Sequence, residues 1–175
     1  YLNSGPGAVA GAFIHRRHAQ NTTLPRYAGW WGNDPDTRFR MEPEFVARPS
    51  ADGWQLSNPP ILSMAPVIAS LALFDEAGGV AALRGKSRVL TGYFDYLLRE
   101  RAPRGETVIT PADAEARGCQ LSLRVQGDAA DRQRDLADRG FWLDKREPDI
   151  LRAAPVPLYN SFEEVWRLVD ALAAE

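Results

Sequence analysis

The chain has 175 residues, of which 45% are apolar and 25% charged, and its formal net charge at pH 7 is −2. This composition is typical of a globular protein with a buried core, and the near-neutral charge argues against a nucleic-acid partner or an anionic membrane surface. No apolar run reaches the ~20 residues of a membrane span, so we expect no membrane partner. Cys119 is the single cysteine, which excludes an intrachain disulfide and favours a reducing cytoplasm.

The first 60 residues show little periodic structure. Residues 10–19 (AGAFIHRRHA) predict a short strand and residues 54–57 (WQLS) a second one, and the segment between them is rich in Gly and Pro. A loop of this length is usually functional or wrapped over a partner. We therefore expect residues 1–60 to be the loop-rich remainder of a larger domain.

Two connecting helices are expected over residues 61–101. Asn58-Pro59-Pro60 is typical of a helix start, because Asn caps free backbone amides and proline is tolerated in the first turn. Apolar residues then recur at helical spacing as far as Gly78-Gly79, with Pro66 inside the pattern. The second helix is predicted over about residues 80–101.

Residues 102–175 predict a small α/β domain. Four strand-like segments, ETVITP, CQLSLRVQ, FWLDKR and ILRAAPV, are interrupted by a polar helix that ends near Gly140. Ser161 and Glu164 have the spacing of a capping box. The apolar stripe of the C-terminal helix that follows consists of Phe162, Val165, Trp166, Val169 and Leu172.

Seven segments of the chain are together far more specific than any one motif. In order they are YLNSGPGAVAGAFIHRRHA, GWWG, TRFRM, LSNPPIL, LTGYFDYLL, ITPADAEARGCQLSL and LRAAPVPLYNSFEEV. In this order and spacing the chain resembles the C-terminal half of a kynureninase. Kynureninases are similar in fold to other fold-type I enzymes of the class V aminotransferase superfamily, which use pyridoxal 5′-phosphate (PLP). The resemblance implies that residues 1–60 complete a large PLP-binding domain, that residues 102–175 form the small C-terminal domain, and that the enzyme is a homodimer.

The resemblance also implies an activity. Kynureninases hydrolyse the Cβ–Cγ bond of L-kynurenine or 3-hydroxy-L-kynurenine, giving L-alanine and an anthranilate, in tryptophan catabolism and NAD biosynthesis. In the family, the lysine that forms the Schiff base with PLP lies immediately before the YLNSGPG segment. It is therefore expected immediately before Tyr1, and no catalytic residue is expected within the chain. Lys86 and Lys145, the two lysines present, lie in other contexts, so we expect residues 1–175 alone to be inactive.

Three positions of the chain match residues that bind cofactor or substrate in the family. Trp30, in GWWG, matches a tryptophan whose indole N–H reaches the PLP phosphate, and an indole is a donor only. Asn58 matches an active-site asparagine that contacts cofactor or substrate, and the Ser57-Asn58 pair favours the 3-hydroxylated substrate. Arg152 matches the arginine that grips the substrate α-carboxylate through two parallel donors. Without the resemblance, aromatic packing, a helix cap and a surface arginine would explain the same residues.

Other readings remain open. The chain could belong to another class V PLP enzyme, epimerase-like or desulfurase-like, or could be a non-catalytic dimerisation fragment. A desulfurase needs an exposed nucleophilic cysteine on a mobile loop, whereas Cys119 opens an apolar strand and is expected to be buried. His15 and His18 have no metal-ligand partners in the sequence, so no metal site is expected.

Overall fold

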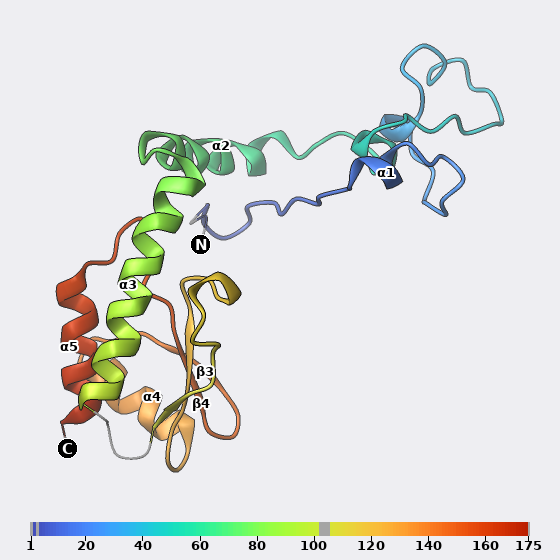
Figure 1. Cartoon of the computed structure of the whole chain (residues 1–175). Coiled ribbons are helices and arrows are strands. Elements are labelled where there is room, and N and C mark those ends of the chain that lie inside the picture. Colours follow the sequence, from blue (N-terminus) through green and yellow to red (C-terminus); the bar gives the residue numbers. More distant parts are fainter. Residues whose placement is uncertain (1, 3, 102–105, 175) are drawn as a thin grey trace. The chain divides into compact units, whose positions relative to one another are not determined.

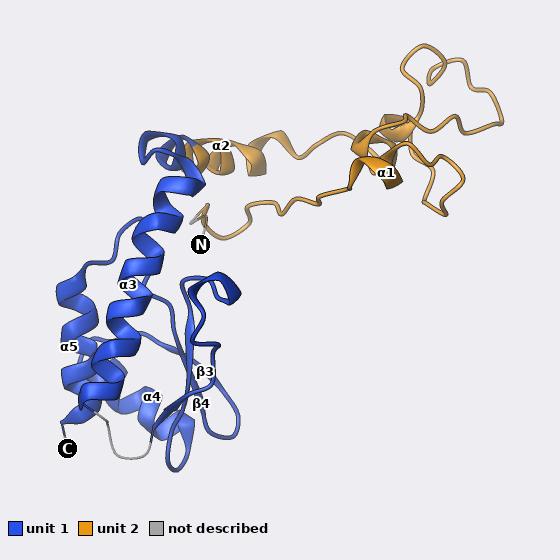
Figure 2. Cartoon of the chain, viewed as in Figure 1, with its two compact units in different colours: residues 1, 72–175 blue, residues 2–71 orange. Residues whose placement is uncertain are grey.

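The computed structural model of the chain describes residue 2, residues 4–101 and residues 106–174. Figure 2 shows its two compact units, residues 2–71 and residues 72–175. The boundary between the units falls within helix α2 (Ile61–Glu76). Tyr1, before which the Schiff-base lysine is expected, and Asn3 lie outside the described residues.

The unit over residues 2–71 consists mainly of loops joined by short helical turns (Figure 1). Before α2, its elements are α1 (Arg16–Ala19) and two 3-10 helices, Trp30–Gly32 and Ala51–Trp54. The strands expected over residues 10–19 and 54–57 are wrong, because no described segment pairs with either. A strand is completed by a hydrogen-bonded neighbour, and the isolated pairing that the described residues show outside the sheet joins Asn33 to Ala47.

Helix α2 begins later than the asparagine cap predicts. Its first turn closes with a hydrogen bond from the Met64 amide to the Pro60 carbonyl at 3.1 Å. Pro60 therefore precedes the first helical residue, and the capping role expected for Asn58 is wrong because the cap lies two positions further along. The helix ends before Gly78 and Gly79, whose φ values of 85° and 76° lie in the left-handed region that glycine tolerates.

The unit over residues 72–175 contains a four-stranded antiparallel sheet in the order β1-β2-β4-β3. The strands are β1 (Thr107–Val108), β2 (Leu121–Arg124), β3 (Asp144–Arg146) and β4 (Ile150–Ala153). All four predicted strand segments are confirmed, although each is shorter than its sequence pattern. In the register, Arg152 on β4 lies between Ser122 on β2 and Asp144 on β3.

Three helices accompany this sheet, namely α3 (Gly79–Arg101), α4 (Ala129–Asp138) and α5 (Phe162–Ala173). Figure 1 shows α3 and α5 packed side by side. Their apolar faces and those of β2 and β4 share one core, whose largest fully buried side chains include Phe94, Leu90, Leu121, Leu123, Leu136 and Leu151. Burying each such side chain contributes about 1.5–3 kcal/mol to the free energy of folding, relative to leaving it exposed. This core therefore stabilises the unit.

Residues alternate along β2 and β4 between this core and the opposite face of the sheet. Leu121, Leu123 and Leu151 are buried, whereas Ser122 and Arg152 between them are half-buried. Side chains of a strand alternate with period two. Arg152 therefore lies on the face of the sheet that points away from the helices.

The C-terminal helix confirms its predicted start. Ser161 caps α5, and the Ser161 and Glu164 side chains form a capping box with each other's backbone amides. The apolar stripe is confirmed in its centre, but Phe162 and Trp166 keep 42% and 39% of their surface exposed. Within the described residues, no single helix meets the length and hydropathy of a bilayer span, although the bent pair α2 and α3 does so jointly.

Candidate functional site

The unit over residues 2–71 forms a cavity of about 580 Å³ that brings together three residues suggested by the sequence. Trp30, Ser57 and Asn58 all line it, although 27 positions separate the first two in the chain. The remaining lining residues are Gly29, Trp31, Phe39 and Leu56. An indole donor, a hydroxyl and an amide are thus presented from an otherwise apolar wall.

Two glycines allow the two halves of this wall to meet. A Cβ placed on Gly29 would overlap the backbone of Leu56, and one on Gly32 would lie 2.9 Å from the carbonyl oxygen of Gly53. Contacts this close to backbone atoms leave no room for a side chain. The GWWG segment therefore needs glycine at both ends, so that Trp30 can sit against the segment that carries Ser57.

Trp30 is partly exposed at this cavity. Its ring meets that of Phe39 edge to face, with 5.6 Å between centroids and an interplanar angle of 87°, and 53% of its surface is accessible. Within the described part of the chain, no hydrogen bond from the indole N–H is formed, so this donor is available to a ligand. Phe39 was not singled out by sequence reasoning, although it lies in the TRFRM segment.

The loop between the two halves is ordered by polar contacts. The side-chain oxygen of Asn33 accepts from the Val46 amide at 2.9 Å, and the Asp34 amide donates to the Val46 carbonyl at 2.8 Å. The guanidinium of Arg38 lies 5.0 Å from the centroid of the Trp31 ring, a cation–π contact. These contacts hold the aromatic wall in place without regular secondary structure.

Arg152 belongs to the other unit and is held by two neighbours. Its Nε and Nη2 atoms donate to the Gln120 side-chain oxygen at 2.9 and 2.6 Å. Its Nη1 atom lies 3.1 Å from a carboxylate oxygen of Asp144. Sequence reasoning missed both partners. Gln120 lies 32 positions and Asp144 8 positions from Arg152 in the chain, and no local sequence pattern predicts either contact.

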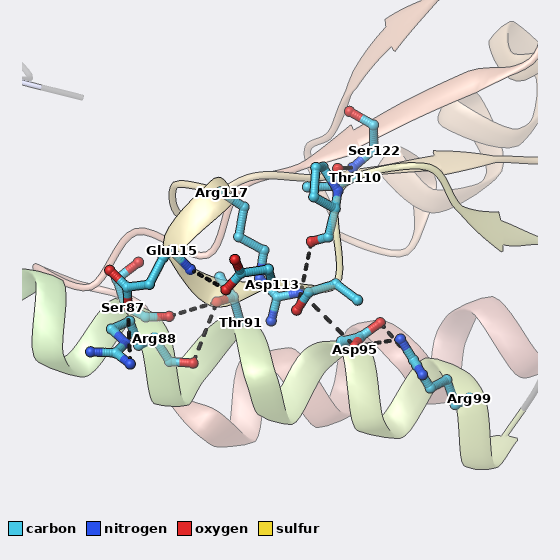
Figure 3. Close-up of polar contacts among 12 residues, drawn as sticks. Ser87, Arg88, Thr91, Asp95, Arg99, Thr110, Asp113, Glu115, Arg117 and Ser122 are labelled. Carbon is cyan, nitrogen blue, oxygen red and sulfur yellow. Dashed lines mark hydrogen bonds and ion pairs between the residues drawn. The ribbon is translucent and has the colours of Figure 1, made fainter.

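A polar network anchors the loop that leads from β1 into β2 (Figure 3). Arg117, whose side chain is 4% exposed, donates to the carbonyls of Pro111 and Ala112 at 3.2 Å each and lies 3.9 Å from an Asp95 carboxylate oxygen. Asp95 is on α3, so this arginine joins the loop to the helix. The loop is therefore fixed three residues before Gln120.

Cys119 and both lysines occupy structural settings. Cys119 is half-buried and precedes β2 rather than opening it, and burial raises the pKa of its thiol. The Lys86 ammonium donates to the Pro157 carbonyl at 2.6 Å, and Lys145 pairs with Glu147 at 3.2 Å. In the described ranges, no three His, Cys, Asp or Glu side chains gather where they could hold a metal ion.

Two solved structures resemble the chain in fold. A complex of the cystine C–S lyase C-DES with cysteine persulfide matches with a TM-score of 0.67 and 17% identity, over 85% of this chain and 38% of that one. The apo cysteine desulfurase from Thermococcus onnurineus NA1 matches with a TM-score of 0.65 and 16% identity, over the same shares. At this identity the likeness concerns the fold alone, and it confirms the expected α/β fold of the fold-type I, PLP-dependent transferase type.

Sequence comparisons identify the family. Residues 83–172 match the model of the kynureninase C-terminal domain. The kynureninase of Xanthomonas euvesicatoria pv. vesicatoria is 56% identical over 99% of this chain and 41% of its own length, and that of Myxococcus xanthus is 56% identical over 98% and 40%. The chain thus spans about two-fifths of the length of these curated relatives. It belongs to the kynureninase C-terminal domain family.

Proposed function

We propose that the chain is the C-terminal part of a kynureninase, a PLP-dependent hydrolase that cleaves L-kynurenine or 3-hydroxy-L-kynurenine to L-alanine and the matching anthranilate. The observation that carries this proposal is the 56% identity to a kynureninase over 99% of the chain. Because the chain spans 41% of that relative, the activity is assigned to the full-length protein. On this proposal it acts as a cytoplasmic homodimer in tryptophan catabolism and NAD biosynthesis.

The residues that line the cavity in the unit over residues 2–71 are suited to hold part of PLP. When bound, PLP supplies the electron sink that cleavage of the carbon–carbon bond requires. Trp30 is proposed to donate its indole N–H to the cofactor phosphate, because that donor is unused among the described residues and projects from an apolar wall. Asn58 lines the same cavity and offers both a donor and an acceptor to cofactor or substrate.

Ser57 and Asn58 are proposed to favour the 3-hydroxylated substrate. Both side chains can donate to and accept from a phenolic hydroxyl. A site built to hydrogen-bond a hydroxyl group discriminates strongly against an analogue that lacks it, because its polar groups are then left unpaired. We expect kcat/KM of the full-length enzyme to be higher for 3-hydroxykynurenine than for kynurenine.

Arg152 is proposed to bind the substrate α-carboxylate. A guanidinium offers two parallel N–H donors to a carboxylate, which fixes orientation as well as charge. Its side chain keeps 30% of its surface exposed, so the arginine is not fully covered within its own unit. The matched control is Arg124, which lies on the same face of the sheet and pairs with Asp149 at 3.3 Å.

The 175-residue chain alone is proposed to be inactive. Lys86 and Lys145 already have polar partners, Pro157 and Glu147, in the unit over residues 72–175. Neither lysine belongs to the unit over residues 2–71, which contains Trp30. Helix α2 exposes large apolar side chains, with Leu62 at 89% and Ile68 at 66%. A helix that is apolar all round is normally buried, which supports a chain that functions within a larger protein.

The desulfurase-like alternative is disfavoured by Cys119. A nucleophilic cysteine needs a lowered pKa and an exposed position. The thiol of Cys119 has a raised pKa, caused first by burial, and it lies within the loop that Arg117 anchors. Cys119 therefore lacks the lowered pKa and the exposed position that a desulfurase nucleophile needs.

The proposal is tested on a full-length protein that carries this chain. Arg152→Ala is expected to lower kcat/KM by the factor that corresponds to about 2–5 kcal/mol of lost charge-paired binding. The kcat/KM of Arg124→Ala is expected to stay near that of the parent. Trp30→Phe is expected to weaken PLP retention by ~1.5–3 kcal/mol, one hydrogen bond to a charged acceptor, with Trp142→Phe in the other unit as its control. Absence of turnover of either substrate would overturn the assigned activity. Parent-like Arg152 and Trp30 variants would overturn the residue assignments alone.

A further inference from the structure

The guanidinium of Arg152 is held along one edge by a neutral oxygen. Nε and Nη2 form that edge, and both donate to the single side-chain oxygen of Gln120, at 2.9 and 2.6 Å. A carboxylate oxygen of Asp144 lies 3.1 Å from Nη1 as an ion pair. A guanidinium has five N–H donors, and Gln120 accepts two of them. Among the described residues, no hydrogen bond is formed by Nη1 or by the second N–H of Nη2, so both terminal nitrogens keep a donor for a ligand.

The two partners of Arg152 differ in strength. The Asp144 carboxylate is 52% exposed and is shared with Arg146, whose Nη1 lies 2.7 Å from the same oxygen. An exposed and shared ion pair contributes little. Gln120 is half-buried and makes two short hydrogen bonds, so it determines the rotamer of the arginine more than Asp144 does.

Gln120 is itself held in place. Its side-chain nitrogen donates to the Ser122 hydroxyl at 3.2 Å, which leaves its oxygen turned toward the arginine. The Ser122 amide in turn donates to the Thr110 hydroxyl at 2.8 Å. Together with the anchoring of the preceding loop by Arg117 (Figure 3), these bonds fix the glutamine oxygen before any ligand arrives.

We propose that Gln120 is the positioning residue for Arg152, and that its neutrality is as important as its geometry. This inference rests on the proposed role of Arg152 in binding the substrate carboxylate. A neutral acceptor orients the guanidinium without adding a second negative charge to that of Asp144. A carboxylate at position 120 would keep the hydrogen bonds but compete with the substrate for that charge, because like charges at short range repel.

The test compares Gln120→Met and Gln120→Glu in the full-length enzyme. Gln120→Met removes the acceptor of both hydrogen bonds at similar volume and is expected to raise KM about tenfold, because the guanidinium is then no longer held in the orientation that the carboxylate needs. Gln120→Glu is expected to raise KM further than Gln120→Met, with kcat and PLP retention close to the parent for both variants. Gln133→Met, which removes a hydrogen bond to the Leu143 carbonyl in the same unit, serves as the matched control and leaves KM unchanged.

A second readout separates positioning from folding. Competitive inhibition is measured with a substrate analogue whose α-carboxylate is replaced by a carboxamide. Both Gln120 variants are expected to bind the carboxylate substrate more weakly than the parent enzyme does. Their affinity for the carboxamide analogue is expected to stay at the parent value. If Gln120→Glu binds substrate better than Gln120→Met, or both equal the parent while Arg152→Ala is impaired, this inference fails and the proposed function stands. If Arg152→Ala itself retains the parent KM, the assigned role of Arg152 fails first.

Discussion

Arg117 is expected to be the most costly single charge to remove from the unit over residues 72–175. Its guanidinium is almost fully buried, donates to two loop carbonyls and faces Asp95 on α3. Arg117→Met keeps the apolar stem and deletes these contacts, so the carbonyls of Pro111 and Ala112 lose their charged donor. Asp95 retains Arg99 at 3.0 Å, so no carboxylate is left without a cation.

The magnitude follows from those contacts. Hydrogen bonds to a charged group contribute about 1.5–3 kcal/mol each, and removing one partner of a buried charge pair costs ~3–5 kcal/mol. Because the separation from Asp95 is long, at 3.9 Å, most of the loss comes from the carbonyls. Both bonds come from the same Nη1 atom at 3.2 Å, and the two accepting residues are exposed to water, so the loss falls below the sum of two full bonds. We expect Arg117→Met to lower the free energy of unfolding by about 2–4 kcal/mol, and Asp95→Asn to cost less than this.

The assay is urea unfolding of the chain, monitored by far-UV circular dichroism. The free energies of unfolding are compared between variants whose fitted m-values agree. The control is Arg134→Met, which removes an ion pair to Asp131 of 3.0 Å whose two side chains are 71% and 73% exposed. An exposed pair of this kind contributes about 0.2–1 kcal/mol. Equal losses for Arg117→Met and Arg134→Met would refute the reasoning, since burial would then make no difference.

Four other changes test the cavity, the core and the last helix. Gly29→Ala is expected to push the aromatic wall off the facing backbone and to speed tryptic cleavage of its loop, whereas Gly85→Ala, with open space around it, leaves cleavage unchanged. Phe94→Ala, at a fully buried position, is expected to lower unfolding free energy by about 3–5 kcal/mol in urea. Ser161→Ala removes a capping box and is expected to cost ~0.5–2 kcal/mol of thermal stability. Hydrogen bonds, first from the Ser161 amide, lower the pKa of Glu164 below its ordinary 4.5. The ionised Glu164 side chain therefore stabilises the fold above pH 4.5, and this contribution is lost as pH falls through the lower pKa of the folded state. Glu164→Gln should therefore flatten the acid limb of the stability curve.

Elements with local signals were predictable from the sequence. The start of α5 follows from Ser161 and Glu164, whose hydroxyl and carboxylate need only the backbone amides of their own turn. The core strands β2 and β4 follow from the alternation of apolar residues such as Leu121, Leu123 and Leu151. In both cases the interactions that stabilise the element lie within a few residues or repeat with a fixed period.

The sequence by itself also determined the family and which side chains to consider at the site, because the motifs are local and specific. Only the tertiary structure decided that residues 10–19 form no strand, since a strand depends on a partner that may lie anywhere in the chain. It also brought Phe39 to Trp30, and Gln120 to Arg152 across 32 positions. Such contacts depend on loop closure and sheet register, which no local pattern encodes, and therefore the groups that orient the predicted site residues became visible only in the folded chain.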